Sequence, residues 1–421
     1  MAKTYYTYKD SGIAWIGEIP SEWEVKRLGN FYNPRNEKVS DKDFAPLSVT
    51  MKGIVPQLET AAKTDDGDNR KLVREGDFVI NSRSDRRGSC GISEFDGSVS
   101  LINIVLCPKG KMDAGFFNWL FHTSMFADEY YKWGHGIVDD LWTTRWSEMK
   151  NIYVVNPSLQ EQHSIASFLD SRCAEIDALI SLQEEMISEL QAYKQSVITE
   201  AVTKGLNPNV KMKDSGVEWI GEIPEGWGVD KIFRVFKNIG SGTTPKATED
   251  NNFEGEINWI QSGDINGGIM NSCKNKISQD ILYKYSALKV YKAPFIIVAM
   301  YGASVGNISV SMIDGCVNQA CCVMSDSIHY FDYLFYTIKS AKDYLIYRAE
   351  GGGQPNISQD KLKNLWLPVP PLTEQQSIAN YLDEKTSQID SLITLKQEKI
   401  QELKDYKKSI IYEYVTGKKR V

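Results

Sequence analysis

Hydrophobic residues recur at spacings of three and four along two long stretches of the chain, and this spacing is typical of amphipathic helices. The apolar positions run from Ile176 to Ile198 in the first stretch and from Ile389 to Ile411 in the second. Each stretch predicts a helix of about thirty residues, roughly 45 Å long at about 1.5 Å per residue. We also expect a short lead-in helix before each, near residues 161–169 and 374–382.

The two apolar stripes are suitable partners for each other. We expect an antiparallel, left-handed helix pair with knobs-into-holes packing, because a duplicated unit whose halves meet through one face most simply adopts a pseudo-twofold axis. The alternative is that each helix packs only on its own domain. The predicted core positions of the helix pair are Ile176, Leu179, Leu190, Tyr193, Val197, Ile389, Leu392, Leu403, Tyr406 and Ile410.

The helices belong to a larger duplication. Residues 9–28 read KDSGIAWIGEIPSEWEVKRL and residues 213–232 read KDSGVEWIGEIPEGWGVDKI, with twelve of twenty positions identical. Residues 157–203 and 370–416 form a second matching pair, whereas residues 29–156 and 233–369 do not visibly match each other. A period near two hundred residues is too long for a solenoid, so the pattern indicates a duplicated domain pair.

The predicted fold class is α+β, with two mixed α/β domains separated by an antiparallel two-helix coiled-coil spacer and an internal pseudo-twofold duplication. The expected boundaries are residues 1–156 and 207–369 for the two domains, and 157–206 and 370–421 for the two helix regions. Residues 1–8 precede the first WIGEIP block as residues 205–212 precede the second, so the layout is circular and the chain ends should lie close together. For the WIGEIP blocks themselves we expect a structural role.

Composition leaves nucleic-acid binding open. A net charge of −7 over 421 residues argues against a protein coated in positive charge, but phosphate contacts need only a local stripe of Lys and Arg. No apolar run is long enough to span a bilayer and the amino terminus lacks the apolar region of a signal peptide, so we expect a cytoplasmic protein. Seven cysteines without a CxxC pair argue against a disulfide framework and a zinc site.

The layout resembles the specificity subunit of type I restriction-modification systems over the whole chain. The resemblance rests on PLTEQ at residues 371–375 with its copy PSLQEQ at 157–162, on IA..LD at 165–170 and 378–383, on the long helices, and on the paired WIGEIP blocks. In the second variable domain, SGTTPK at 241–246 followed by INWIQSGDI at 257–265 is similar to a common opening of that family's target recognition domains.

The resemblance implies a non-catalytic subunit with two target recognition domains, each reading half of an asymmetric, bipartite sequence in double-stranded DNA. It implies as partners two methyltransferase subunits, which methylate adenine with S-adenosylmethionine, and ATP-driven restriction subunits, with no membrane association. S-adenosylmethionine, ATP and Mg are accordingly expected on the partner subunits, and no cofactor is expected in this chain.

Residues suited to chemistry are hard to find. No methyltransferase glycine motif or Asn/Asp-Pro-Pro-aromatic motif is present, and GSGTTPK at 240–246 does not meet the phosphate-loop spacing. The four histidines show no ligand spacing, the glycine cluster at 351–355 suggests a loop, and the pair Asp139 and Asp140 suggests a solvated surface. We therefore predict no catalytic residue and no metal ligand.

The variable domains instead offer side chains suited to DNA. The segment NSRSDRRG at 81–88 places arginines among small polar residues, and Asn or Gln can pair bidentately with adenine. The predicted DNA-binding residues are Ser82, Arg83, Arg86, Arg87, Thr243, Thr244, Lys246, Gln261, Ser262, Tyr301, Ser304, Asn307 and Gln319. The alternatives are a solvated basic loop in the first domain and, for Asn318 and Gln319, satisfaction of buried backbone groups.

Two functions of other classes are kept as rivals: a coiled-coil scaffold without a DNA role, and an enzyme acting on DNA through an unrecognised site. Methylation or cleavage of DNA by the purified chain alone would support the enzyme. Absence of salt-dependent DNA binding by the assembled complex would support the scaffold.

Overall fold

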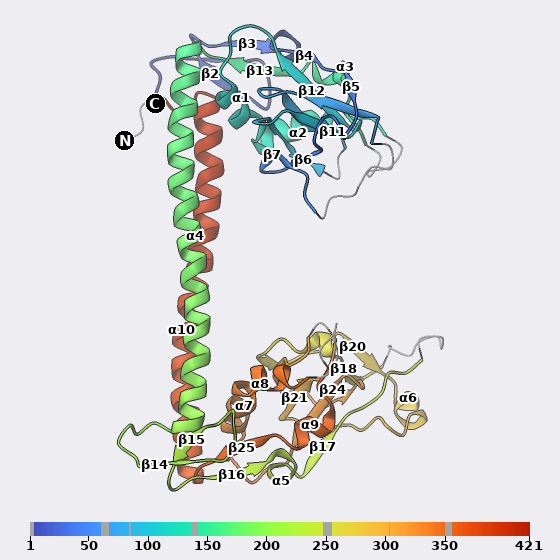
Figure 1. Ribbon diagram of the computed structural model, residues 1–421, viewed down its shortest axis with the longest axis vertical. Helices are drawn as coiled ribbons and strands as arrows, with labels where there is room; N and C mark the ends of the chain where they lie inside the picture. Colours follow the sequence, from blue (N-terminus) through green and yellow to red (C-terminus); the bar gives the residue numbers. More distant parts are fainter. Residues whose placement is uncertain are drawn as a thin grey trace. The chain divides into compact units, whose positions relative to one another are not determined.

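The computed structural model describes residues 4–59, 67–83, 86–136, 142–246, 255–302, 304–349 and 356–421. The chain divides into two compact units, one made of Met1–Glu184 with Gln397–Val421 and the other of Glu185–Lys396. Each unit contains a mixed α/β domain and a part of both long helices, whose course along the chain can be followed by colour in Figure 1.

The long helices are α4, Leu159–Lys204, and α10, Leu372–Val415. The separate lead-in helices expected from the sequence are absent, because residues 161–169 and 374–382 form the first turns of these two continuous helices. Neither helix contains a glycine or proline that would interrupt its backbone hydrogen bonding, which is the physical reason for the continuity. No helix among the described residues is long and apolar enough to cross a membrane.

In the first unit α4 and α10 run antiparallel. The rings of Phe168 and Tyr414 lie 4.5 Å apart between centroids. Nine residues further along α4, the carboxylate of Asp177 accepts from Nζ of Lys407 at 2.6 Å. Because the contact position moves backwards on α10 as it moves forwards on α4, the predicted antiparallel pairing is confirmed in this unit.

The second unit repeats this arrangement. Met186 Sδ accepts from Lys396 Nζ at 3.4 Å, and the Asp390 carboxylate accepts from Lys194 Nζ at 2.6 Å. This Asp–Lys pair is the repeat equivalent of the pair in the first unit, since each residue is displaced by 213 positions and the roles of the two helices are exchanged. The same ion pair therefore forms twice, once in each unit.

The contact seam between the helices differs from the predicted core. Four predicted core residues are exposed: Leu179 at 47%, Tyr193 at 58%, Leu392 at 48% and Tyr406 at 51%. The buried and half-buried positions instead alternate at spacings of three and four, which is the heptad pattern. On α10 they are Thr386, Ile389, Ile393, Lys396, Ile400, Leu403, Lys407 and Ile410, and on α4 they are Ile176, Ile180, Gln183, Ile187, Leu190, Lys194 and Val197.

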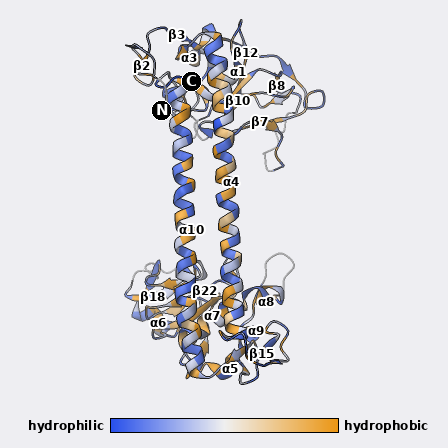
Figure 2. Cartoon of the chain, turned by 90° about the vertical axis from the view of Figure 1, so that its left-hand side faces the viewer, coloured by the Kyte–Doolittle hydropathy of each residue, from blue (hydrophilic) through white to orange (hydrophobic). Residues whose placement is uncertain are grey.

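The correction has a simple physical cause. Lysines such as Lys194 and Lys407 occupy heptad positions because their alkyl stems pack while their Nζ atoms reach a carboxylate. A prediction from hydrophobicity alone assigns these lysine positions to the surface. It therefore assigns neighbouring leucines and tyrosines to the core in their place. Figure 2 shows hydrophilic and hydrophobic residues alternating along both helices.

The described residues of the α/β domain of the first unit form short antiparallel sheets, three α-helices and the 3-10 helix η1. One sheet has the order β10-β9-β12-β4 and another β11-β8-β5, and β6 pairs with β7. The strands are β4 Tyr32–Pro34, β5 Lys38–Val39, β6 Leu47–Thr50, β7 Gly53–Pro56, β8 Arg70–Val73, β9 Phe78–Asn81, β10 Cys90–Ile92, β11 Gly97–Val99 and β12 Asn103–Pro108. The helices are η1 Leu28–Asn30, α1 Ala114–Phe121, α2 Ser124–Lys132 and α3 Trp146–Met149.

The α/β domain of the second unit is built on a mixed five-stranded sheet of order β17-β24-β21-β22-β19 and a three-stranded sheet of order β20-β18-β23. The strands are β17 Asn238–Gly240, β18 Ile257–Ile260, β19 Ile269–Met270, β20 Asn275–Ile277, β21 Phe295–Ala299, β22 Ile308–Ser311, β23 Cys316–Val317 and β24 Cys321–Ser325. The helices are α5 Ile232–Val235, η4 Ser262–Asp264, α6 Gln279–Lys284, α7 Phe331–Ser340, α8 Lys342–Tyr347 and α9 Gln359–Lys363. The two domains therefore differ in topology as they do in sequence.

Each domain is joined to the helices by the same short strands. In the first unit β1 Tyr8–Asp10 pairs with β2 Glu18–Pro20, and β3 Glu24–Arg27 pairs with β13 Tyr153–Asn156. In the second unit the equivalents are β14 Met212–Asp214 with β15 Glu222–Pro224, and β16 Gly228–Lys231 with β25 Trp366–Val369. The WIGEIP blocks thus end in a strand of this framework, as their predicted structural role requires.

The chain ends meet in the first unit. The hydroxyl of Tyr8 donates to the carbonyl of Lys418 at 3.2 Å, and Nζ of Lys418 donates to the carbonyl of Ile16 at 3.1 Å. The predicted proximity of the ends is confirmed. Gly417, at a φ of +74°, turns the chain after α10, and Gly205, at a φ of +75°, turns it after α4. Both left-handed turns need glycine, since a side chain at such a φ is strained.

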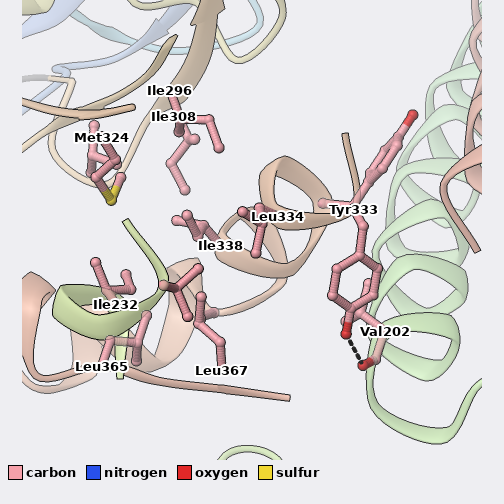
Figure 3. Packing of buried hydrophobic residues seen from close by; sticks show 14 of the residues in the cluster. Val202, Ile232, Ile296, Ile308, Met324, Tyr333, Leu334, Ile338, Leu365 and Leu367 are labelled. Atoms are coloured by element: carbon pink, nitrogen blue, oxygen red, sulfur yellow. Dashed lines mark hydrogen bonds between the residues drawn. The ribbon is translucent and has the colours of Figure 1, made fainter. Parts of the chain in front are cut away.

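A continuous apolar core joins the second α/β domain to its parts of the long helices. Tyr333 of α7 lies fully buried, and its hydroxyl donates to the carbonyl of Val202 on α4 at 3.2 Å, as Figure 3 shows. Leu334 and Ile338 extend from the same helix toward the sheet residues Ile296 and Ile308 (Figure 3). Helix α7 therefore packs against both α4 and the sheet, so the domain is held directly on the helices.

Candidate nucleic-acid interface

Several strands of the second α/β domain end at one edge, and the predicted polar residues gather there. Ala299 at the end of β21 pairs with Cys321 at the start of β24, and Gly240 at the end of β17 pairs with Val323. The chain leaves the ends of β17, β18, β21 and β23 into the segments at 241–246, 261–262, 301–302 with 304–307, and 318–319, a set that we call the polar edge. The topology thus brings together segments that are far apart in the sequence.

An exposed amide lies in the middle of the polar edge. Oε1 of Gln319 accepts from Oγ1 of Thr244 at 2.5 Å, and both side chains are exposed. Burial raises the pKa of Tyr301, and a hydrogen bond with the Gln319 side chain partly opposes this rise. An exposed amide held by two neighbours is suited to reading the edge of a base, because its orientation is fixed before contact.

Other predicted residues of this edge support the loops instead. Asn307 donates from Nδ2 to the carbonyl of Ile265 at 3.2 Å and accepts from Nζ of Lys342 at 3.0 Å. Gln261 accepts from Nδ2 of Asn275 at 3.2 Å. These hydrogen bonds give Asn307 and Gln261 a supporting role within the domain, and their contact with DNA stays a prediction.

The remaining positions divide between exposed and supporting roles. Lys246 is exposed, whereas Thr243, Ser262 and Ser304 are half-buried. The backbone carbonyl of Thr243 accepts from the indole of Trp259 at 3.2 Å. Asn318 is 9% exposed and its Oδ1 accepts from the backbone N–H of Ala320 at 3.1 Å. The alternative of a structural role is therefore confirmed for Asn318, while Gln319 beside it faces solvent.

In the first unit the arginine-bearing loop follows β9. The side chains of Arg83, Arg86 and Arg87 are exposed. The guanidinium of Arg87 forms an ion pair with Asp128 and lies over the ring of Tyr131, 5.8 Å from its centroid. The loop is thus anchored on α2 through Arg87, and Arg83 and Arg86 remain on the surface as the basic groups of this region.

Ser82 does not belong to the exposed surface. It is 6% exposed, and its hydroxyl donates to the carbonyl of Ile102 at 2.5 Å. The expectation that Ser82 contacts DNA is corrected, because the side chain is used to hold the loop on the start of β12. Residues 84–85 of the loop, the acid pair at 139–140 and the glycine cluster at 351–355 lie outside the described residues.

A cavity of about 220 Å³ with a mixed polar and apolar lining lies beside this loop, and of its lining residues the sequence analysis predicted Ser82 but neither Lys71 nor Arg145. Lys71 and Arg145 contribute cationic groups to it, together with Asn36 and Thr143. Burial lowers the pKa of Lys71, whose Nζ donates to the carbonyl of Asn103 at 2.6 Å. The lining residues come from five separate stretches of the chain, so no local motif predicts them.

Comparison with known proteins finds similarity to type I specificity subunits. Residues 224–405 match the family model of the type I restriction modification DNA specificity domain. The MjaVIII specificity subunit, a type I restriction enzyme subunit of Methanocaldococcus jannaschii, is 27% identical, and the match covers 96% of this chain and 94% of that protein. The chain is therefore similar to type I specificity subunits over almost its whole length, and residues 224–405 match their DNA specificity domain.

Solved structures show the same fold. A structure from a study of complex assembly and conformational transition of the type I restriction-modification system superposes with a TM-score of 0.72 at 16% identity, covering 94% of this chain and 98% of that one. A crystal structure of the HsdS subunit of Thermoanaerobacter tengcongensis gives a TM-score of 0.52 at 18% identity, covering 95% and 98%. The chain therefore has the α+β fold with long helices that the sequence predicted.

Proposed function

We propose that this chain is a specificity subunit that reads an asymmetric, bipartite sequence in double-stranded DNA, one half-site with each α/β domain. The observation that carries the proposal is the combination of an ion pair that repeats in both units with two domains of different topology. Equivalent frames present their domains in equivalent ways, whereas different domains read different bases. A duplex is itself twofold about its dyad, so equivalent frames suit opposite strands.

In the second domain, the exposed Gln319 with Thr244 and Tyr301 is the proposed base-reading group, and Lys246 a proposed phosphate contact. In the first domain we propose that Arg83 and Arg86 contact the duplex. Exposed guanidinium groups match both phosphate oxygens and the O6 and N7 atoms of guanine.

The arginine assignment has an internal control. Replacing Arg83 and Arg86 by Ala is expected to weaken binding of one half-site, at about 1–3 kcal/mol for each lost base contact. Arg87→Ala removes the ion pair with Asp128 and is expected to act through loop order. Binding of DNA that carries either half-site alone tests this assignment. An equal loss of affinity for every DNA sequence would show that the two arginines contact phosphates only.

The partners follow from surfaces that the chain leaves exposed. Leu179, Leu182 and Tyr193 of α4 are between 47% and 58% exposed, and their repeat equivalents Leu392, Leu395 and Tyr406 of α10 are between 48% and 61% exposed. Exposed apolar residues repeated at equivalent positions fit two copies of one protein partner. We propose that they help to dock two methyltransferase subunits, with S-adenosylmethionine, ATP and Mg bound by methyltransferase and restriction subunits.

The proposal is tested by methylation mapping of genomic DNA with the chain present and deleted. A bipartite methylation motif with two unlike halves is expected. Exchange of residues 232–365 for those of another specificity subunit should change one half of the motif only. Methylation by the purified chain without partners would point to an enzyme. An assembled complex without salt-dependent DNA binding would point to a scaffold, and either result would overturn the proposal.

A further inference from the structure

A short face at the start of each long helix carries a repeated set of residues. In α4 it consists of Gln162, Ile165, Ala166, Leu169 and Asp170, and in α10 it consists of Gln375, Ile378, Ala379, Leu382 and Asp383. The spacing of three, one, three and one places the five side chains on one side of a helix. We call each such set a socket. The α/β domain of each unit packs against its socket, and the same two polar contacts recur.

The first contact uses a buried glutamine. Gln162, 3% exposed, accepts with Oε1 from the backbone N–H of Asp113 at 3.0 Å. Gln375, 1% exposed, accepts with Oε1 from the backbone N–H of Tyr330 at 2.8 Å. Asp113 and Tyr330 are the N-cap residues of α1 and α7. A helix start has backbone N–H groups without an internal acceptor, so the glutamine satisfies the same kind of group in two different domains.

The glutamines are themselves fixed in the frame. Nε2 of Gln162 donates to the carbonyl of Pro157 at 2.9 Å, and Nε2 of Gln375 donates to the carbonyl of Pro370 at 2.8 Å. Each amide thus joins the strand-to-helix turn of the frame to the first helix of the domain. A buried amide with both ends bonded has one orientation, and leaving it unpaired would be costly.

The second contact uses an aspartate two turns further along. The indole N–H of Trp119 on α1 donates to Oδ1 of Asp170 at 2.8 Å, and the hydroxyl of Tyr336 on α7 donates to Oδ1 of Asp383 at 2.8 Å. Trp119 and Tyr336 each stand six residues after the N-cap residue of their helix. The donor position is therefore the same in both domains although the residue differs.

Apolar packing fills the space between the two polar contacts. Ile165, Ala166 and Leu169 are at most 4% exposed, and a side-chain carbon added at Gly115 of α1 would lie 3.2 Å from Cβ of Ala166. In the second unit Ile378, Ala379 and Leu382 are at most 1% exposed and share a core with Tyr333 of α7, which Figure 3 shows against α4. The small alanine lets the domain helix approach the long helix closely.

We infer that the two sockets are equivalent docking sites for recognition domains, and that Gln162, Asp170, Gln375 and Asp383 are positioning residues that set the pose of each domain on its helix. To dock on a socket, a domain needs only a helix N-terminus and one aromatic hydrogen-bond donor six residues after the N-cap residue. Neither requirement constrains the bases that the domain reads. The sockets therefore accept domains of unrelated sequence in a common pose, which goes beyond the proposed function.

The first test needs no DNA. In the full chain assembled with its methyltransferase subunits, Gln162→Met removes the acceptor for the Asp113 amide and keeps the volume. Hydrogen exchange at that amide is expected to accelerate at least about tenfold. The Phe116 amide, which donates to Asp113 within α1, should keep its protection as an internal control. Loss of protection from exchange at both amides, or at neither, would contradict the positioning role of Gln162.

The second test rests on the proposed function. Trp119→Phe removes the donor to Asp170, whereas Trp119→Tyr supplies the donor that the second socket already uses. Binding is compared on DNA with native half-site spacing and with one added base pair. Trp119→Phe is expected to lower the preference for native spacing by about threefold to tenfold, and Trp119→Tyr to restore it.

The two readouts keep the socket separate from DNA recognition. Equal weakening of both DNAs by Trp119→Phe, or no recovery with tyrosine, would show a merely structural role and overturn the inference. The matched pair Tyr336→Phe and Tyr336→Trp gives the same comparison in the second unit. If the wild-type complex showed no sequence preference, only the proposed function would be contradicted. The hydrogen-exchange experiment on Gln162→Met would still test the socket.

Discussion

Amide side chains have two separable tasks at the scale of single residues. Gln162 and Gln375 are buried and join the frame to a domain, whereas Gln319 is exposed and bonded to Thr244. Residue type alone does not distinguish these tasks, since all three residues are glutamines. Burial and the identity of the bonded partner separate them.

The reading role of Gln319 leads to a prediction on one half-site. Gln319→Leu keeps the size of the side chain but loses its hydrogen bonds, so discrimination at one base pair should fall by about 1–3 kcal/mol. Binding to a panel of single-base variants of the site measures the change. Gln388→Leu, an exposed glutamine on α10, is the matched control. An unchanged panel would assign Gln319 to the surface without a reading role.

His329 gives the second socket a pH dependence. Its Nδ1 lies 3.0 Å from Nε2 of Gln375, an amide that donates, so the contact needs a neutral imidazole. Burial lowers the pKa of His329, and the nearby Asp230 carboxylate opposes this only in part. A lowered folded pKa means that the unfolded chain binds more protons, so stability falls as pH drops below the ordinary histidine value of about 6.5.

The histidine prediction is checked by thermal unfolding between about pH 7.5 and pH 5. The assembled wild type is expected to lose stability below about pH 6.5, and His329→Asn, which keeps an acceptor, should lose less over the same range. Identical curves for the two proteins would exclude His329 as the titrating group.

At the scale of elements, α4 and α10 are held by a heptad seam in which lysine and glutamine alternate with aliphatic residues. Lys194 and Lys407 lie in the seam with side chains 20% and 25% exposed, while their aspartate partners are each 57% exposed. Such partly exposed ion pairs contribute little stability each, in the range of about 0–1 kcal/mol. Their repeated placement instead favours one register of the helix pair over others.

The corrected seam is tested by two leucines on the same helix. Leu190 is half-buried in the seam and Leu182 is 48% exposed. Leu190→Asp is expected to destabilise the chain by about 1–3 kcal/mol because an unpaired carboxylate loses hydration there. Leu182→Asp should change stability by less than about 0.5 kcal/mol. Chemical denaturation of both variants decides the matter, and a larger loss of stability in Leu182→Asp than in Leu190→Asp would contradict the heptad seam.

At the scale of the whole molecule, the two continuous helices each begin in one compact unit and end in the other. Removing residues 181–187 from α4 and 396–402 from α10 deletes one heptad from both and keeps the phase of the seam. Each helix then shortens by about 10 Å, the length of about three base pairs of duplex.

If the two helices act as the predicted spacer and set the distance between the half-sites, this double deletion should shift the preferred half-site spacing toward shorter sites or abolish methylation. Methylation of a library of sites with varied central gaps provides the measurement. Full activity on the original spacing would reject the helices as the element that sets the gap. Deleting four residues from each helix is the control, since it breaks the seam phase and should prevent folding.

Much of the frame, meaning the short strands and long helices that both halves share, was predictable because its sequence occurs twice in the chain. The repeated apolar spacing announced two long helices, and the duplication itself argued for their antiparallel pairing, which the Asp177–Lys407 contact and its equivalent confirm. The seam was predicted less well. Leu179 and Tyr193 read as core from their hydrophobicity, whereas Gln183 and Lys194 hold those contacts through their alkyl stems.

The candidate site divides in the same way. Residue type correctly picked Gln319 and the exposed arginines as surface groups, but it also picked Ser82 and Asn307, which tertiary hydrogen bonds occupy. Lys71 and Arg145 were missed, because only the folded chain brings them to one cavity. No local pattern carries such long-range placement.

The sequence by itself determined the repeated frame, the long helices and their direction, because periodicity and duplication are properties of the chain alone. Only the tertiary structure decided which amides read and which support, where the helix seam lies, and that Trp119 and Tyr336 serve one purpose in two unlike domains. Those outcomes depend on which groups become buried beside which partners, and burial is fixed only when distant segments pack.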